Sequence, residues 1–356
     1  MLDLLYIQKY YYYFIAFISF IILISVLSYS RRTSWQAIIK FAVYIFAFFT
    51  IYYLGSRDIN IGVDTFRYEQ NFLEYKYSSS FQISKDPFYD FLSYILSRFF
   101  EFSTLLFLCA FIYVFGALYG LRKIFKENYF LPFLVFIISP YFINSGINVM
   151  RSGVASSLFL AGLGLYYERG MKWKTASFFI LSVLFHISLL VPLFCFILTR
   201  FIKNTKVIFI AWLISIVLGI LKINVIITLV QNLGLFEARI GSYANNDGDR
   251  VFWLNFVIFG FIPVVLGVYN ILILKYKDGF YTWLVNAYML IHIPYIILIN
   301  SQFGSRLGYL AEFMLPIILL FPLLNNPLIK INYARINLSI IIFIVFMLKA
   351  YKVLVI

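Results

Sequence analysis

Long apolar runs alternate with short polar connections along most of the chain. At a rise of ~1.5 Å per residue, ~20 apolar residues form a helix that crosses a bilayer. The pattern predicts spans near residues 5–28, 37–54, 103–121, 130–146, 149–167, 207–223, 251–274, 281–300, 305–324 and 336–354. No period of 20–50 residues repeats. We therefore predict one all-α, polytopic integral membrane domain over residues 1–356, with about ten or eleven transmembrane helices.

Residues 175–199 do not fit a simple crossing. Basic residues flank this apolar segment on both sides, with Lys172 and Lys174 before it and Arg200, Lys203 and Lys206 after it. The segment is too short for two full crossings but long enough for a re-entrant hairpin, whose irregular backbone is tolerated where it is buried or lines a wet cavity. We favour the hairpin; a single crossing with basic residues on the unfavoured side is the alternative.

Residues 87–100 predict an amphipathic helix too short to span. Asp86 is expected to be its N-cap, with Pro87 in the first turn. Apolar residues then recur at helical spacing, opposite a polar face with Asp90, Ser93 and Ser97. Such a helix is expected to lie in the membrane interface, against lipid or over a cavity.

The composition supports a membrane protein, because 63% of the residues are hydrophobic and only 12% are charged, compared with roughly 25% in soluble domains. Residues 1–30 lack the features of a cleavable signal peptide, so the first run is expected to remain as a span. The net charge of +14 is scattered through short loops, which indicates positive-inside topology and no nucleic-acid partner. Cys109 and Cys195 lie inside apolar runs, so no disulfide or metal site is expected, and no cofactor is implied.

The basic loops also predict the orientation. Loops that contain Arg31, Arg122–Lys126 and Lys275–Lys277 are expected to be cytoplasmic. The loop 55–102 has five Lys and Arg against seven Asp and Glu, and the loop 224–250 is polar and balanced. Both are therefore expected on the outer side.

Arg151 is the most unusual charge, because it lies one turn inside a predicted span, in the stretch Asn144–Ala155. An ionisable residue in a membrane segment suggests a functional site. Asn148 and Ala155 share its helix face. The alternative is an arginine that extends to the interface beside a helix end.

Other polar residues are expected near the same outer region. Asp64 follows the second span, His186 lies in the irregular segment, and the remaining candidates are Arg239, Tyr243, Arg306, Tyr309 and Glu312. Each has a structural alternative: His186 can be a core histidine and Asp64 a turn residue. Taken together, several arginines around an outward cavity suit a diphosphate, whose oxygens match the guanidinium fork. A diphosphate on a lipid carrier reaches such a site from the membrane.

Two roles follow for the histidines. A neutral imidazole accepts a proton at neutral pH, so His186 is the candidate catalytic base and Asp64 the alternative. His292 and Glu312 lie at equal depth, ~12 Å below the outer surface, on two helices joined by a short turn. We expect them to pair, mainly for structural reasons.

The chain resembles the EpsG/Wzy-type polysaccharide polymerases of bacterial membranes. The resemblance rests on Gly62-Val-Asp-Thr-Phe-Arg-Tyr68, Asn148-Val-Met-Arg-Ser-Gly-Val-Ala155, Phe185-His-Ile-Ser-Leu189 and Arg306-Leu-Gly-Tyr309. These short motifs occur in the order typical of the family, over roughly residues 55–315. Ser152 stands where the family usually has Gln. Asp86-Pro-Phe-Tyr89 is only loosely similar to a Glu/Gly/aromatic cluster, so we assign Asp86 no chemistry.

The resemblance implies a GT-C-like, metal-independent membrane glycosyltransferase in the bacterial cytoplasmic membrane, with its cavity facing the periplasm or exterior. It would transfer a growing glycan from undecaprenyl diphosphate to a hydroxyl of the next lipid-linked repeat unit. His186 and Asp64 would be catalytic. The lipid-linked substrate would contact Arg151, Arg306, Arg239, Tyr309, Tyr243, Asn148 and Glu312. A protein that regulates chain length is a further expected partner.

Three other functions remain open. A lipid-linked oligosaccharide flippase or other transporter would also present arginines to a diphosphate, but along a path through the whole membrane. A glycan ligase or a membrane acyltransferase would share the outer cavity. The sequence does not name the sugar, the linkage or the kind of polysaccharide.

Overall fold

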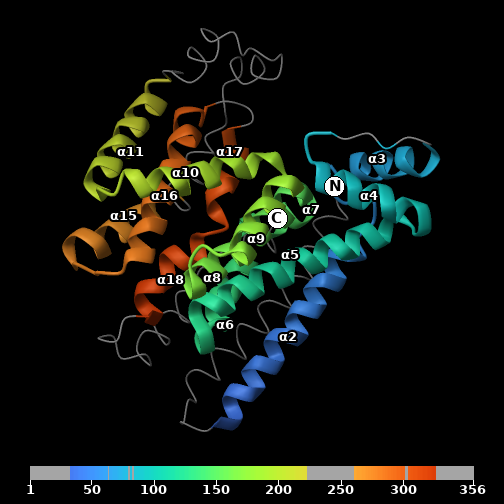
Figure 1. Ribbon diagram of the computed structural model, residues 1–356, viewed down its shortest axis with the longest axis horizontal. Helices are drawn as coiled ribbons and strands as arrows, with labels where there is room; N and C mark the ends of the chain where they lie inside the picture. The colour runs from blue at the N-terminus through green and yellow to red at the C-terminus, as the bar shows by residue number, and fades with distance from the viewer. Residues whose placement is uncertain are drawn as a thin grey trace, which may run out of the picture. The chain divides into compact units, whose positions relative to one another are not determined.

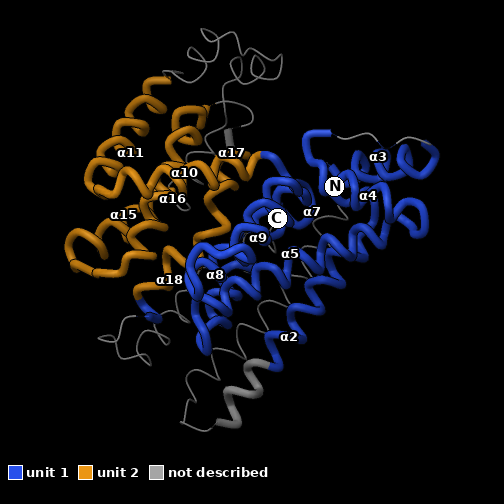
Figure 2. The backbone as a smooth tube through the Cα atoms, in the orientation of Figure 1, with its two compact units in different colours: residues 1–187, 323–356 blue, residues 188–322 orange. Residues whose placement is uncertain are grey.

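The computed structural model describes residues 33–62, 64–78, 81, 84–222, 260–300 and 304–325, and in these residues it contains helices and turns but no strands. This confirms the prediction of an all-α polytopic membrane protein. The predicted spans 5–28 and 336–354, and the loop 224–250 with Arg239 and Tyr243, lie outside the described residues. The chain divides into two compact units, residues 1–187 with 323–356 and residues 188–322 (Figure 2). A single domain over residues 1–356 stays a prediction.

The first unit is built around α5 (Phe102–Phe125), an apolar helix that packs against α2 (Thr33–Gly55) and α8 (Met150–Arg169) (Figure 1). α9 (Trp173–Phe185) packs on α8. The shorter helices of this unit are α3 (Thr65–Tyr77), α4 (Pro87–Phe99), α6 (Phe130–Ile138) and α7 (Pro140–Ile147). Most of α8 is buried, including its serines and glycines.

The second unit centres on α16 (Gly279–Ile297). α11 (Thr205–Ile220) and α10 (Leu190–Phe201) pack against it. Trp283 Nε1 donates to the carbonyl of Phe196, 3.0 Å away, and so ties α16 to α10. The remaining helices are α15 (Ile262–Val268), which continues into a π-helix (Tyr269–Ile273), α17 (Gly304–Glu312) and α18 (Leu315–Asn325).

Three stretches of the described chain are long and apolar enough to cross a membrane, namely Phe102–Asn128, Gly279–Ile297 and Arg306–Asn325. The predicted span 130–146 is not continuous, because α6 and α7 meet at an angle of 65°. Pro140 cannot continue the hydrogen bonding of α6, and it restricts Ser139 to an extended conformation. The Ser139 hydroxyl accepts a hydrogen bond from the Phe142 N–H and caps α7. The pair still counts as a candidate fourth, broken span.

The segment 175–199 contains a break in its helix. α9 ends at Phe185, a 3-10 turn covers Ile187–Leu189, and α10 begins at Leu190. His186 lies at the break in an extended conformation, with φ −156° and ψ 115°. The two arms belong to different units, so the hairpin itself stays a prediction.

Helix α4 forms where the sequence predicts it, with its polar side turned inward. Asp90, Ser93 and Ser97 are buried together with Tyr89, whereas Phe91, Ile95 and Phe99 are exposed. In a soluble protein the apolar side of such a helix would face the core. Here the apolar side is exposed, which is the arrangement expected of a helix in the membrane interface.

Glycines allow α5 and α8 to approach closely. A Cβ atom on Gly120 would overlap the backbone of Leu160, and a Cβ atom on Gly164 would overlap the backbone of Gly120. Gly116 faces Ser157 in the same way. Small residues of this kind replace the hydrophobic effect as the source of tight helix packing inside a membrane.

This packing predicts that a glycine-to-alanine substitution destabilises the protein at Gly120 but not at Gly279. Gly120→Ala gains helix propensity worth about 1 kcal/mol but must push α8 away, at a cost of about 1–3 kcal/mol. We expect a lower unfolding temperature for the protein purified in detergent. Gly279→Ala is the control, because nothing lies within 4 Å of its added methyl group. Equal unfolding temperatures for Gly120→Ala and wild type would contradict the close approach.

Candidate functional site

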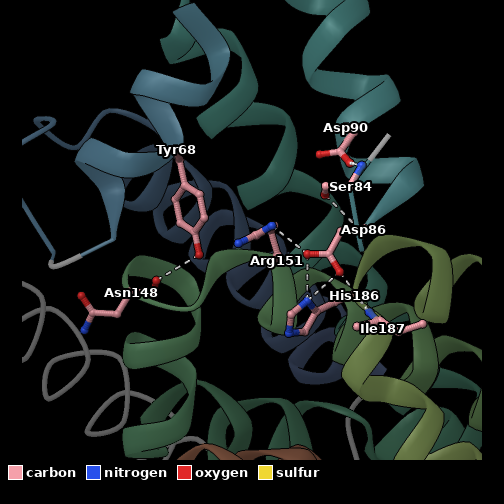
Figure 3. A network of polar contacts seen from close by, with 8 residues as sticks. All are labelled: Tyr68, Ser84, Asp86, Asp90, Asn148, Arg151, His186 and Ile187. Carbon is pink, nitrogen blue, oxygen red and sulfur yellow. Dashed lines mark hydrogen bonds and ion pairs between the residues drawn. The ribbon is translucent and has the colours of Figure 1, made fainter. Parts of the chain in front are cut away.

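The buried carboxylate of Asp86 joins three helices (Figure 3). Its Oδ2 accepts a hydrogen bond from Arg151 Nη1 at the start of α8, 2.7 Å away. His186 Nδ1, at the end of α9, lies 3.1 Å from both carboxylate oxygens. The Ile187 N–H donates to Oδ1 at 3.1 Å. Only 3% of the Asp86 side chain is exposed, so these contacts replace its hydration.

Asp86 is held in place by the turn that precedes α4. The Asp86 N–H donates to Ser84 Oγ at 3.3 Å, and the Ser84 N–H donates to Asp90 Oδ2 at 2.7 Å. Pro87 occupies the first turn of α4, where its missing N–H costs nothing. Asp86 itself makes no side-chain capping bond to α4, so its carboxylate is free to point toward α8 and α9.

The surroundings of Asp86 favour its ionised form. Burial raises its pKa, but the hydrogen bond with His186 and the charges of His186 and Arg151 outweigh burial. The net result is a pKa below the ordinary value of 3.8. The site therefore holds a permanent carboxylate at neutral pH.

The carboxylate decides which nitrogen of His186 carries hydrogen. An ionised carboxylate only accepts hydrogen bonds, so Nδ1 must be the donor to Asp86. In a neutral imidazole the other nitrogen, Nε2, then has a lone pair. The side chain is 26% exposed, and Figure 3 shows Nε2 turned away from Asp86. This is the arrangement of an oriented general base.

Arg151 lies beside a pair of tyrosine rings, Tyr68 and Tyr89, whose centroids are 6.0 Å apart. The centre of its guanidinium is 5.4 Å from the ring centroids of both Tyr68 and Tyr89, a distance at which a cation is attracted to the ring face. Its side chain is 30% exposed. Since Asp86 engages one nitrogen, the guanidinium keeps further N–H groups for an anion.

The motif Gly62–Tyr68 packs against the motif Asn148–Ala155, which contains Arg151. Tyr68 donates through its hydroxyl to the carbonyl of Asn148 at 3.2 Å. Gly62 has a φ of +93°, and a Cβ atom there would meet Ile147 and Asn148 at 2.6 and 2.9 Å. Only glycine satisfies both conditions. The Asn148 side chain donates to Asn144 Oδ1, so Asn148 contributes its backbone to the site.

Asp64 takes a different place from Asp86. It precedes α3 and lies 3.8 Å from Arg67 Nη1, whose side chain is 76% exposed. In the described part of the chain, no hydrogen bond links Asp64 to His186 or Arg151.

The remaining candidates belong to the second unit or lie outside the described residues. Arg306 is exposed, Tyr309 is half-buried and Glu312 is buried, all on α17. Their position relative to Arg151 stays a prediction. Arg239 and Tyr243 lie outside the described residues.

His292 makes no hydrogen bond to Glu312. Its Nδ1 lies 3.0 Å from the carbonyl of Tyr288, one turn back on the same helix, and its buried Nε2 has no partner. Equal depth on two helices leaves the rotation of each helix about its axis open, so the proximity of the two side chains stays a prediction.

Asp86 is the residue that sequence reasoning missed. The prediction that Asp86 is the N-cap residue of α4 is confirmed, but its carboxylate makes no capping bond and binds Arg151 and His186 instead. The loose similarity of Asp86-Pro-Phe-Tyr89 to an acidic family cluster was the available signal. Within the described residues, no group of three His, Cys, Asp or Glu side chains is arranged to hold a metal ion.

Asp86→Asn should destabilise the protein at neutral pH. It leaves Arg151 without its carboxylate, at a cost of about 2 kcal/mol. Because folding lowers the pKa of Asp86, the stabilisation is present above pH ~4 and is lost as the pH falls through the folded value. Thermal unfolding in detergent should show a gap to wild type at pH 7 that narrows below pH ~4. Asp64→Asn, whose partner is exposed, should change stability by less than ~1 kcal/mol. Equal shifts for the two variants would contradict the central role of Asp86.

The sequence was also compared with known protein families. The EpsG family matches residues 40–356, which include every residue of the Asp86 network. Searches of curated proteins and of solved structures found no match. The match covers most of the chain, and the protein is therefore a member of the EpsG family.

Proposed function

We propose that this protein is a polysaccharide polymerase that transfers a growing glycan from undecaprenyl diphosphate to a hydroxyl of the next lipid-linked repeat unit. Family membership supports a function in polysaccharide polymerisation at a membrane. The observation that carries the specific reaction is the contact of one buried carboxylate with both His186 and Arg151. It supports the proposal because it holds an imidazole and a guanidinium beside one carboxylate.

In the proposed step, His186 Nε2 takes the proton of the acceptor hydroxyl. The acceptor oxygen forms a bond to the anomeric carbon of the growing glycan, and the bond from that carbon to the diphosphate oxygen breaks. Undecaprenyl diphosphate leaves with the bonding electrons. Asp86 orients the imidazole and stabilises the imidazolium that forms.

Arg151 serves the leaving group. Charge develops on the diphosphate as its bond to the sugar breaks, and a preorganised guanidinium stabilises that charge. The neighbouring rings of Tyr68 and Tyr89 add cation–π attraction that helps to hold the guanidinium in place. Arg306, Tyr309 and Glu312 are proposed to contact the lipid-linked substrate from α17.

The proposed place of the reaction is the outer face of the bacterial cytoplasmic membrane, where the predicted outer loop 55–102 contributes Asp86. The exposed apolar side of α4 supports a site at the membrane interface. A lipid carrier in that leaflet then reaches Arg151 without leaving the bilayer.

His186→Ala is expected to fold and bind lipid-linked repeat units but to form no polymer. Loss of a general base lowers a rate by about 10²–10⁴-fold. The assay uses purified protein in vesicles with lipid-linked repeat units. Gel separation of the glycans then measures how much polymer forms. Asp64→Asn tests the alternative base in the same assay and should still produce a ladder if His186 takes the proton. A ladder from His186→Ala would remove His186 from catalysis and leave Asp64 as the next candidate.

The same wild-type assay separates the rival functions. A polymerase lengthens the glycan in steps of one repeat unit without any other acceptor. A ligase or acyltransferase leaves the repeat unit at its original length, and a transporter moves it across the vesicle membrane unchanged. If folded wild-type protein leaves the repeat units single, the proposal is contradicted.

Arg151→Lys should weaken binding of the lipid-linked substrate although the positive charge is kept. Lysine has no planar guanidinium that could donate to Asp86 and to a diphosphate at the same time. The expected loss of substrate affinity is therefore about 10-fold or more. Titration of the substrate in the polymerisation assay should show a higher KM. Arg306→Lys is expected to act in the same direction. Normal polymerisation by both variants would show that these arginines do not bind the diphosphate.

A further inference from the structure

Arg57 is a second buried arginine in the first unit, directly after α2. Only 8% of the residue is exposed. Its Nη1 donates to the carbonyl of Leu54 at 2.6 Å, and its Nη2 donates to Sδ of Met150 at 3.4 Å. Its Nε is buried and has no acceptor. Within the described residues, no carboxylate lies within ion-pair distance of Arg57.

A buried charge without a partner is costly and therefore informative. Burial lowers the pKa of Arg57 to about 10, and the groups that oppose this effect are Cys109, Tyr68 and Tyr89. Thiols and phenols are neutral at pH 7, so Arg57 remains charged and uncompensated. The carbonyl end of α2 supplies only a partial negative charge, of about half a unit. A helix cap therefore explains one donor of Arg57 but not its whole charge.

Arg57 lies beside the Asp86 network. Its Nη2 contacts Met150, the residue immediately before Arg151. Met150 and Arg151 are the first two residues of α8, so the contact places Arg57 at the same end of that helix as Arg151.

The charges around Asp86 explain why a second cation matters. The carboxylate of Asp86 and the guanidinium of Arg151 cancel. This ion pair has no net charge to attract a polyanion. Arg57 adds one positive charge beside it.

We propose that Arg57 is the second cation of the diphosphate site and provides the positive charge that Asp86 cancels on Arg151. The inference rests on the proposed function, since it concerns the binding of the same lipid diphosphate. Arg57 has donors to spare, because Nε has no acceptor and Nη2 has only a thioether sulfur, a weak one. A phosphate oxygen is a far better acceptor for them.

The first test compares Arg57→Gln with Arg57→Lys. Glutamine keeps an N–H donor for the carbonyl of Leu54 but removes the charge, whereas lysine keeps the charge. The probe is farnesyl diphosphate, titrated calorimetrically into purified protein in detergent. Arg57→Gln should bind on the order of 10-fold more weakly, and Arg57→Lys should stay within about threefold of wild type.

Arg98→Gln is the matched control for the first test. Arg98 is exposed and also donates to carbonyls at the end of a helix, those of Lys76 and Ser78 after α3. It lies over Tyr94 and not over the tyrosines of the site. This variant should bind the probe like wild type. Unchanged affinity in folded Arg57→Gln would overturn the inference.

A second pair of variants leaves Arg57 in place. Met150→Glu puts a carboxylate beside Arg57 Nη2, so the fold keeps its arginine and the charge is cancelled. Met150→Gln has the same shape without charge. The glutamate variant should bind farnesyl diphosphate about 10-fold more weakly than the glutamine variant, with no lower unfolding temperature. Equal affinities in this pair would overturn the inference even if Arg57→Gln failed to fold.

The wild-type titration separates this inference from the proposed function. If wild-type protein binds no farnesyl diphosphate, the proposed diphosphate chemistry itself is wrong. If wild type binds it, and folded Arg57→Gln and Met150→Glu bind it equally well, only the role of Arg57 is wrong.

Discussion

The first unit depends on a single buried carboxylate. Asp86 bonds to Arg151, 65 positions along the chain, and to His186, 100 positions along the chain. Each of these groups is expensive to bury alone, and together they satisfy one another. The start of α4, the start of α8 and the break after α9 are therefore fixed by one interaction. The same interaction sets the hydrogen position on His186. Asp86 therefore has its structural role and its proposed chemical role through the same contacts.

Local patterns predicted the elements of this unit well. The apolar runs gave α5 and α8 to within a few residues, and Asp86-Pro87 gave the start of α4. The break at His186 was anticipated from basic residues on both sides of its segment. These features depend on residues close in sequence, which is why a single chain suffices to find them.

Features that depend on distant residues were harder to predict. Asp86 looked like a helix cap, because its true partners are far along the chain and only folding brings them together. The amphipathic pattern of α4 located two faces but not their direction, since in a membrane protein either lipid or protein can cover the apolar one. Pro140 could be read from the sequence, but the long apolar run around it led to the prediction of one continuous span. His292 shows that depth without helix rotation does not define a pair.

The inverted face of α4 has a mechanical consequence. Its outward phenylalanines make the depth of the helix depend on the thickness and lateral pressure of the surrounding bilayer. Asp86 begins that helix, so any tilt or sinking of α4 moves the carboxylate relative to His186 and Arg151. A hydrogen bond weakens steeply when the angle at its hydrogen falls below ~120°. The lipid around this protein is therefore expected to influence the geometry of the Asp86 contacts, and reconstitution in thin or thick bilayers should change those contacts as well as the solvent.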